Sequence, residues 1–195
     1  MINNNIHNIR EDNNTTDRKL FGFWIYLMSD CILFSTMFAV YCVMLNNIVL
    51  HSMFLNLKFV FFETCLLLLS SITYGISVVS FKYNKIFFVY IFIVITFFLG
   101  LSFVSMELYE FKHLIQLGFT PKKSGFLSSF FTLIGLHGIH VIVGLLWMLG
   151  IIFQIIQFNL NSLIYVRMLC LGLFWHFLDI IWICVFTVVY LLGSI

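Results

Sequence analysis

The chain has 195 residues, of which 62% are hydrophobic and only 9% are charged. A soluble domain carries roughly one-quarter charged residues, so this composition excludes an ordinary soluble protein and indicates a membrane protein. The formal net charge of +2 and the scattered basic residues also exclude a nucleic-acid-binding surface. We therefore expect membrane lipids and other membrane helices as partners, and no nucleic acid.

The first 19 residues are polar, with six Asn among the first 14 positions. They lack the basic flank, short apolar core and cleavage site of a signal peptide. We expect residues 1–19 to form a flexible tail. The five cysteines fall within the apolar segments without close pairing, so they predict neither a disulfide framework nor a CxxC metal site.

Five apolar segments follow, each long enough to cross a bilayer as a helix, which takes about 20 residues. They cover residues 20–45, 59–81, 86–106, 126–157 and 168–192. Short segments with Asn, Gly and the single Pro separate them. The sequence therefore predicts an all-α, polytopic membrane protein in which residues 20–195 form one bundle of five transmembrane helices.

The basic residues between the spans predict an orientation. With the amino terminus in the cytoplasm, six Lys and Arg residues lie on the cytoplasmic side and four on the other side. Cytoplasmic segments of membrane proteins carry the excess of positive charge, so this orientation is favoured. Five spans then place the carboxyl terminus on the periplasmic side.

Six ionisable side chains lie inside the predicted spans. They are Asp30, Glu63, His137, His140, His176 and Asp179. A carboxylate that faces lipid at mid-depth costs on the order of 3 kcal/mol even on the lenient insertion scale. We therefore expect these side chains to face protein, water or a partner subunit.

Helical spacing shows which polar residues share a face, because successive residues are rotated by about 100°. In the fourth span, His137, His140 and Gly144 fall on one stripe, where the glycine would let a neighbouring backbone approach. In the second span, Ser71 and Gly75 form a small-xxx-small pair suited to close helix contact. Glu63 shares a face of that span with other polar residues.

The fifth span contains the sequence WHFLDIIW at residues 175–182. Trp175, Asp179 and Trp182 lie on one face, with His176 at its edge. We expect Asp179 to pair with a histidine of the fourth span, so that this contact fixes the register of the two helices.

Two other interpretations of the buried polar groups remain open. Chains of intramembrane carboxylates and imidazoles serve as proton relays or ion paths in pumps and transporters. Alternatively, the three histidines could be ligands of haem or metal, although their spacings specify no common cofactor. Outside the spans, we expect Glu107 and Glu110 to lie at a solvated helix end and Tyr190 to be an interfacial anchor.

Three stretches resemble subunit III of the haem-copper respiratory oxidases. They are GLHGIHVIVG (135–144), WHFLDIIW with its continuation ICVFTVVYLLG (183–193), and FGFWIYLMSD (21–30). The resemblance covers nearly all of the chain after the polar tail. Mitochondrial-type members have seven helices, whereas five spans together with MELYEFKHL (106–114) are most similar to subunit 3 of bacterial cytochrome bo-type ubiquinol oxidases.

The resemblance implies an accessory, non-redox subunit of a proton-pumping terminal oxidase in the bacterial inner membrane, where the complex oxidises ubiquinol and reduces oxygen to water. Such a subunit is non-catalytic and binds no cofactor or metal, since the haems and copper reside in the partner subunit I. It supports assembly and stability, and it assists proton handling. Glu63 matches the buried carboxylate of the family, and the His and Asp residues of the fourth and fifth spans match its two motifs.

Two functions of other classes compete with this one. A stand-alone proton-coupled carrier could use the faces that carry Glu63 and Asp179, although the odd number of spans and the lack of internal repeats count against it. A haem-bearing membrane anchor would use the histidines and would show a Soret band in the isolated chain.

Overall fold

The computed structural model of the protein describes residues 2–44, 57–83, 85–158 and 162–191. Over these ranges the chain forms helices and short turns, without strands. The helices are α1 (Ile2–Val43), α3 (Leu57–Lys82), α4 (Ile86–Gln116), α5 (Gly125–Phe158) and α6 (Ser162–Val185), and a π-helical segment η1 (Phe186–Leu191) continues α6. Each of the five long helices contains an apolar stretch that can cross a membrane, which confirms the predicted fold class.

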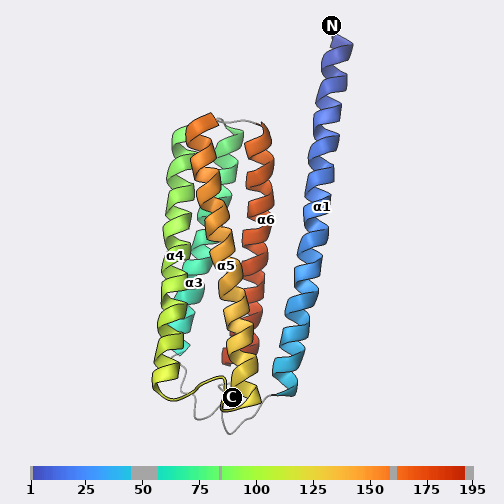
Figure 1. Cartoon of the computed structure of the whole chain (residues 1–195). Coiled ribbons are helices and arrows are strands. Elements are labelled where there is room, and N and C mark those ends of the chain that lie inside the picture. Colours follow the sequence, from blue (N-terminus) through green and yellow to red (C-terminus); the bar gives the residue numbers. More distant parts are fainter. Residues whose placement is uncertain (1, 45–56, 84, 159–161, 192–195) are drawn as a thin grey trace.

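Helices α3, α4, α5 and α6 form a four-helix bundle, and α1 packs outside it against α5 and α6 (Figure 1). Helix α6 is the most buried of the five. Half of its apolar window is covered by other parts of the chain, against 17% for α1. The inner face of α6 is therefore where the polar groups of the bundle can meet, while α1 leaves most of its surface open to lipid or to another protein.

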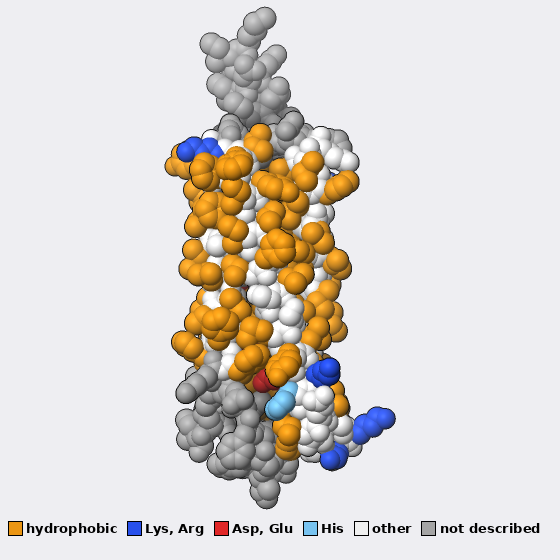
Figure 2. Space-filling model, turned by 90° about the vertical axis from the view of Figure 1, so that its left-hand side faces the viewer, with side chains coloured by type: hydrophobic (Ala, Val, Ile, Leu, Met, Phe, Trp, Pro, Cys, Tyr) orange, Lys and Arg blue, Asp and Glu red, His pale blue; other side chains and the backbone are white. Residues whose placement is uncertain are grey.

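Hydrophobic side chains cover the middle of the face shown in Figure 2, and Lys and Arg side chains lie only near its two ends. This face belongs to the side of the molecule formed by α3 and α4 (Figures 1 and 2). Both helices carry large exposed apolar side chains, including Phe61, Phe87 and Phe98. Such a band is expected where the hydrocarbon of a bilayer surrounds a protein.

Helix α4 ends at Gln116, whereas the sequence predicted an end at residue 106. Its end is a Schellman cap, because the amide of Gly118 donates to the carbonyl of Ile115 and the amide of Phe119 donates to that of Leu114. Gly118 has a φ of +85°, a conformation that side-chain-bearing residues seldom adopt. The added turns place the two glutamates of MELYEFKHL along the bundle instead of beyond it.

Helix α1 begins at Ile2, so the segment expected to be a flexible tail is helical in the structure. It extends past the ends of the other helices (Figure 1). Once a helix has formed, each added residue gains a backbone hydrogen bond, and the segment before Gly22 has no Gly or Pro to stop it. The polarity of the first 19 residues therefore did not predict where α1 begins.

Candidate functional site

The two tryptophans of the WHFLDIIW box attach α6 to α3. The indole Nε1 of Trp175 donates to Ser70 Oγ at 3.0 Å, and that of Trp182 donates to Thr64 Oγ1 at 3.1 Å. All four residues are buried. Both indole N–H groups thus have an acceptor inside the protein, which the apolar core of a bilayer cannot supply.

Two further contacts continue this line toward the other end of α3. Ser71 Oγ lies 2.7 Å from His176 Nδ1, and the Tyr74 hydroxyl donates to the backbone carbonyl of Met168 at 2.8 Å. From Thr64 to Tyr74 along α3, the partner moves back from Trp182 to Met168 along α6, as antiparallel helices require. The four contacts therefore fix a single register between the two helices.

The ring of Trp175 also fills space between two other helices. A Cβ added at Gly100 on α4 would lie 3.0 Å from this ring, and one added at Gly144 on α5 would lie 3.0 Å from it and 3.1 Å from the ring of Phe174. The sequence predicted that Gly144 admits a neighbouring backbone. The structure shows instead that it admits aromatic side chains of α6.

The expected pairing of Asp179 with a histidine of the fourth span is wrong. The nearest imidazole nitrogen to its carboxyl is His176 Nδ1 on the same helix, 3.8 Å from Oδ2. His176 in turn contacts Ser71 on α3 and has a side chain that is 52% exposed, so it is not enclosed by this chain. Asp179 is buried, and its Oδ1 has no hydrogen-bond partner among the described residues. His176 and Asp179 therefore face α3, because the register set by the tryptophans turns this part of α6 toward it.

His137 connects α5 to α6 in a different way. Its Nε2 donates to the backbone carbonyl of Leu178 at 3.3 Å, which assigns the proton of a neutral ring to Nε2. The ring is fully buried between Trp182, at a centroid distance of 5.0 Å, and Phe103, at 5.8 Å. Its surroundings are thus those of a packed core side chain.

His140 points toward α1. Its Nδ1 donates to the carbonyl of Leu136 at 2.7 Å, and its Nε2 lies 3.9 Å from Oδ2 of Asp30. With the proton on Nδ1, a neutral ring has no N–H to offer the carboxylate. The two histidines of the HGxH stripe therefore contact different helices.

Three glutamates gather where α3, α4 and η1 meet. The carboxyl of Glu63 on α3 lies close enough to those of Glu107 and Glu110 on α4 for electrostatic interaction. Tyr190 on η1 donates its hydroxyl proton to Glu110 Oε2 at 3.2 Å. Neither oxygen of Glu63 has a hydrogen-bond partner among the described residues, and nor does Oε1 of Glu107.

Gly138 on α5 makes room for this cluster. A Cβ at that position would lie 2.8 Å from both carboxyl oxygens of Glu107, which is itself 3% exposed. The expectation of a solvated helix end at Glu107 is therefore wrong, and Tyr190, which is 2% exposed, is a buried partner of Glu110 instead of an interfacial anchor. Helix α4 continues to Gln116 before its glycine cap ends it, and this length carries both glutamates into the bundle.

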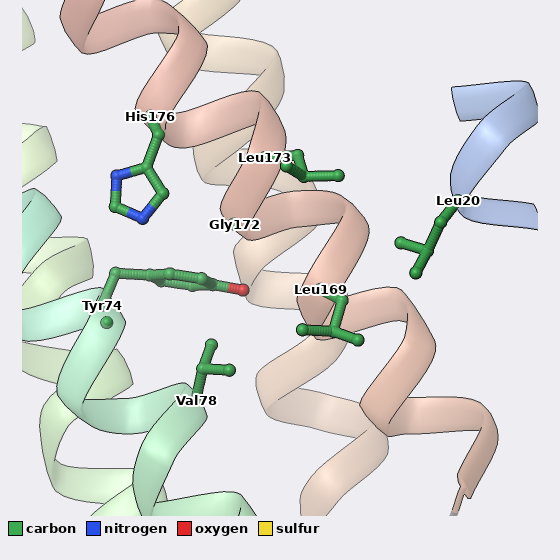
Figure 3. Close-up of a pocket in the computed structure, with 8 residues that line it drawn as sticks. Leu20, Tyr74, Val78, Leu169, Gly172, Leu173 and His176 are labelled. Carbon is green, nitrogen blue, oxygen red and sulfur yellow. The ribbon is translucent and has the colours of Figure 1, made fainter. Parts of the chain in front are cut away.

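Ser71 and Gly75, predicted to form a close helix contact, have different surroundings: Ser71 contacts the ring of His176, and Gly75 borders open space. A Cβ added at Gly75 would meet nothing within 4 Å, because this residue lines a hollow of about 340 Å³ between α1, α3 and α6. Figure 3 shows the ring of Tyr74 crossing this hollow beneath Gly172, with Leu20 of α1 on the opposite side. The close approach between α3 and α6 occurs at Gly172, whose added Cβ would lie 3.1 Å from Tyr74.

The three histidines of the spans have separate contacts. Among the described residues, no three His, Cys, Asp or Glu side chains are grouped so as to hold a metal ion. The three histidines of the spans contact a backbone carbonyl of α6, the Asp30 region of α1 and Ser71 of α3, respectively. They do not face a common cofactor.

Comparison with known proteins gives a family match along almost the whole chain. Residues 11–194 match the family described as cytochrome c oxidase subunit III. The chain belongs to the cytochrome c oxidase subunit III family. The two motif segments and the buried glutamates described above all lie within the matched residues.

Relatives within this family are similar over nearly their full length. The chain is 50% identical over 188 residues to the cytochrome bo(3) ubiquinol oxidase subunit 3 of Buchnera aphidicola subsp. Baizongia pistaciae, covering 94% of this chain and 96% of the relative. It is 49% identical to the subunit of the same name from Pseudomonas aeruginosa, covering 90% and 86%. It is 40% identical to the quinol oxidase subunit 3 of Bacillus spizizenii, covering 89% and 87%. The carrier alternative finds no support in these matches.

Substitution of Gly144 by Ala is expected to destabilise the protein, because the new methyl group would collide with the rings of Trp175 and Phe174. Overpacking of this kind costs about 1–3 kcal/mol. The matched control is Gly150→Ala on the same helix, where an added Cβ meets nothing within 4 Å and helix propensity favours Ala. Thermal unfolding in detergent should show a lower midpoint only for Gly144→Ala. Equal midpoints for the two variants would contradict the packing described here.

Proposed function

We propose that this chain is an accessory, non-catalytic subunit of a terminal oxidase that oxidises ubiquinol, reduces oxygen to water and pumps protons. The observation that carries the proposal is the family match over residues 11–194, together with relatives that are named as subunit 3 of ubiquinol or quinol oxidases and align over nearly their full length. In this proposal subunit I is the principal partner and holds the haems and copper. The enzymatic activity belongs to the complex.

The proposed location is the bacterial inner membrane, with residues 20–195 as a single transmembrane domain and the amino terminus in the cytoplasm. The start of α1, the end of α3, the start of α4, the end of α5 and the start of α6 lie at the same end of the molecule (Figure 1). This end carries Arg18, Lys19, Lys82, Lys85 and Arg167. The excess of positive charge supports placing it on the cytoplasmic side.

For the buried polar residues we propose a structural role. Hydrogen bonds between transmembrane helices contribute about 0.6 kcal/mol on average, so several along one interface are needed to select a register. The contacts of α6 with α3 and α5, and of α5 with α1, provide such a set. A subunit without a redox centre would then act by presenting a fixed surface to its partners and to membrane lipids.

A second role, proton handling, is favoured by the glutamate cluster. Glu63 is fully buried and both of its carboxyl oxygens have no hydrogen-bond partner among the described residues. A carboxyl group held in this way can take up or release a proton without breaking an existing contact.

The function is tested by purifying the tagged chain in mild detergent from cells that make the oxidase. Larger haem-containing subunits should co-purify, and the preparation should reduce oxygen with quinol as the electron donor. Visible spectroscopy, oxygen consumption and mass identification of the subunits provide the readouts. A colourless chain that purifies alone would refute the proposal.

The structural role is tested with Asp179→Leu and the size-matched Asp179→Asn. Asp179→Leu is expected to lower the amount of assembled complex several-fold while leaving the turnover of each assembled complex near that of the native enzyme, because the lost contacts lie within this subunit. Asp179→Asn should assemble normally. Assembly is measured by blue-native electrophoresis, turnover by oxygen uptake, and pumping by acidification around proteoliposomes. Normal assembly with lost pumping in both variants would assign Asp179 to a proton relay instead.

A further inference from the structure

The hollow between α1, α3 and α6 has a polar end and apolar walls. Tyr74 and Gly75 of α3 and Gly172 and His176 of α6 line it, and Leu20 of α1 faces them (Figure 3). Its volume of about 340 Å³ lies within the range of pockets that bind small molecules, about 300–1,000 Å³. The hollow is therefore large enough for a small ring and the start of an attached chain.

His176 brings an imidazole to the middle of the membrane. Arg167 lies near the charged end of α6, and His176 follows nine residues later, about 14 Å along the helix. The hydrocarbon core of a bilayer is about 30 Å thick, so this ring lies near its centre. The side chain of His176 is nevertheless 52% exposed. Hydrocarbon cannot form a hydrogen bond with an imidazole, so a group of another kind must meet this ring.

One nitrogen of the His176 ring has a partner and the other is open. Nδ1 lies 2.7 Å from Ser71 Oγ and 3.8 Å from Oδ2 of Asp179, whereas Nε2 has no hydrogen-bond partner among the described residues. A serine hydroxyl can donate or accept. When Ser71 donates to Nδ1, Nε2 carries the proton and is a donor. When Nδ1 donates to Ser71, Nε2 is an acceptor.

The walls beside His176 leave room for a flat group. A Cβ added at Gly75 would meet nothing within 4 Å, so the α3 wall is open at this point. The ring of Tyr74 crosses the hollow, and its hydroxyl is already bound to the carbonyl of Met168 (Figure 3). Apart from His176, the described lining is therefore apolar or already hydrogen-bonded.

We propose that this hollow binds the ring of a quinol or quinone, with one ring oxygen at Nε2 of His176 and an apolar tail that runs past Gly75. A quinol presents an O–H group that Nε2 can accept, and a quinone presents a carbonyl to which Nε2–H can donate. The contact between Ser71 and His176 therefore allows the same site to hold both forms. The inference rests on the proposed function, because that function makes a quinol the electron donor of the complex. The site binds the quinol and involves no electron transfer.

Two other occupants suit the hollow less well. The polar groups of a phospholipid lie at the membrane interface, whereas His176 lies near the centre of the hydrocarbon, and no Lys or Arg is among the described residues that line the hollow. A protein helix is too large to enter, because a cylinder about 10 Å wide exceeds the volume of the hollow within one turn of about 5.4 Å. A quinol carries its oxygens on a ring that enters hydrocarbon.

The test uses the complex that purifies with the tagged full chain. The probe is an azido-substituted ubiquinone, which attaches to neighbouring residues on illumination, and the labelled peptides of this chain are quantified by mass spectrometry. Unlabelled ubiquinone and phosphatidylethanolamine are added separately as competitors. The variants are Gly75→Leu, which fills the hollow, and His176→Phe, which keeps a ring but removes its nitrogens. The control is Gly150→Leu on α5, where an added Cβ also meets nothing within 4 Å and which does not line the hollow.

In the native chain, the probe should label the parts of α3 and α6 that border the hollow, and unlabelled ubiquinone should suppress this labelling. Gly75→Leu should remove most of it, because the new side chain takes the place of the quinol ring. His176→Phe should weaken binding about tenfold, as expected for the loss of one hydrogen bond inside a membrane. Gly150→Leu should be labelled like the native chain. Gly75→Leu breaks no contact described here, so its result decides the matter even if His176→Phe disturbs packing.

Three results would overturn the proposal. They are absence of labelling at the hollow, suppression of the labelling by phosphatidylethanolamine as well as by ubiquinone, and equal labelling of Gly75→Leu and the native chain. Equal labelling together with loss of a subunit from the Gly75→Leu complex would assign the hollow to a protein partner. The haem spectrum and the quinol-driven oxygen uptake of the native complex test the oxidase assignment by themselves, so its failure is seen separately from a failure of the quinol site.

Discussion

The indole of Trp175 is the contact on which the bundle depends most, because it joins α6 to the three other helices of that bundle. Its N–H is satisfied by Ser70 on α3, and its ring occupies space left by Gly100 on α4 and Gly144 on α5. Water cannot reach a buried N–H group within the apolar core of a bilayer, so the donor requires a protein acceptor. The position of the indole therefore fixes where α6 can lie relative to the other three.

The contact of Trp175 sets the register of α6, and this register determines which residues the other polar side chains of α6 meet. The next residue of α6, His176, meets Ser71. About two turns further toward the carboxyl end of α6, Trp182 meets Thr64 and packs against the ring of His137. Beyond Trp182, η1 carries Tyr190 to the glutamates of α3 and α4. Ser70, Ser71 and Tyr74 thus contact α6 along the middle of α3, while Thr64 contacts it beside Glu63, closer to the start of α3.

Much of the fold could be predicted from the sequence, but most of the contacts between particular side chains of different helices could not. Length and apolarity identify five spans, since the bilayer fixes how long such a helix must be. Helical spacing places Glu63 on one face with Ser70, Tyr74 and Ser77, and all four are buried in the structure.

Spacing along one helix cannot show which neighbouring helix a face contacts. For this reason Asp179 was assigned to a contact with α5 although it faces α3. The burial of Glu107 could not be predicted because two carboxylates at the end of an apolar run also suit a solvated helix end, whereas α4 continues past them to its cap at Gly118.

The most direct test of this account is a double-mutant cycle between Ser70→Ala and Trp175→Phe, with the free energy of unfolding measured in lipid bicelles. If the indole N–H is bound by Ser70, the serine substitution should cost less when the indole is already absent. The coupling energy should be about 0.5–1.5 kcal/mol, the range for a hydrogen bond between membrane helices. Costs that add to within about 0.3 kcal/mol would show that the two residues act independently. The account of Trp175 as the contact that positions α6 would then be wrong.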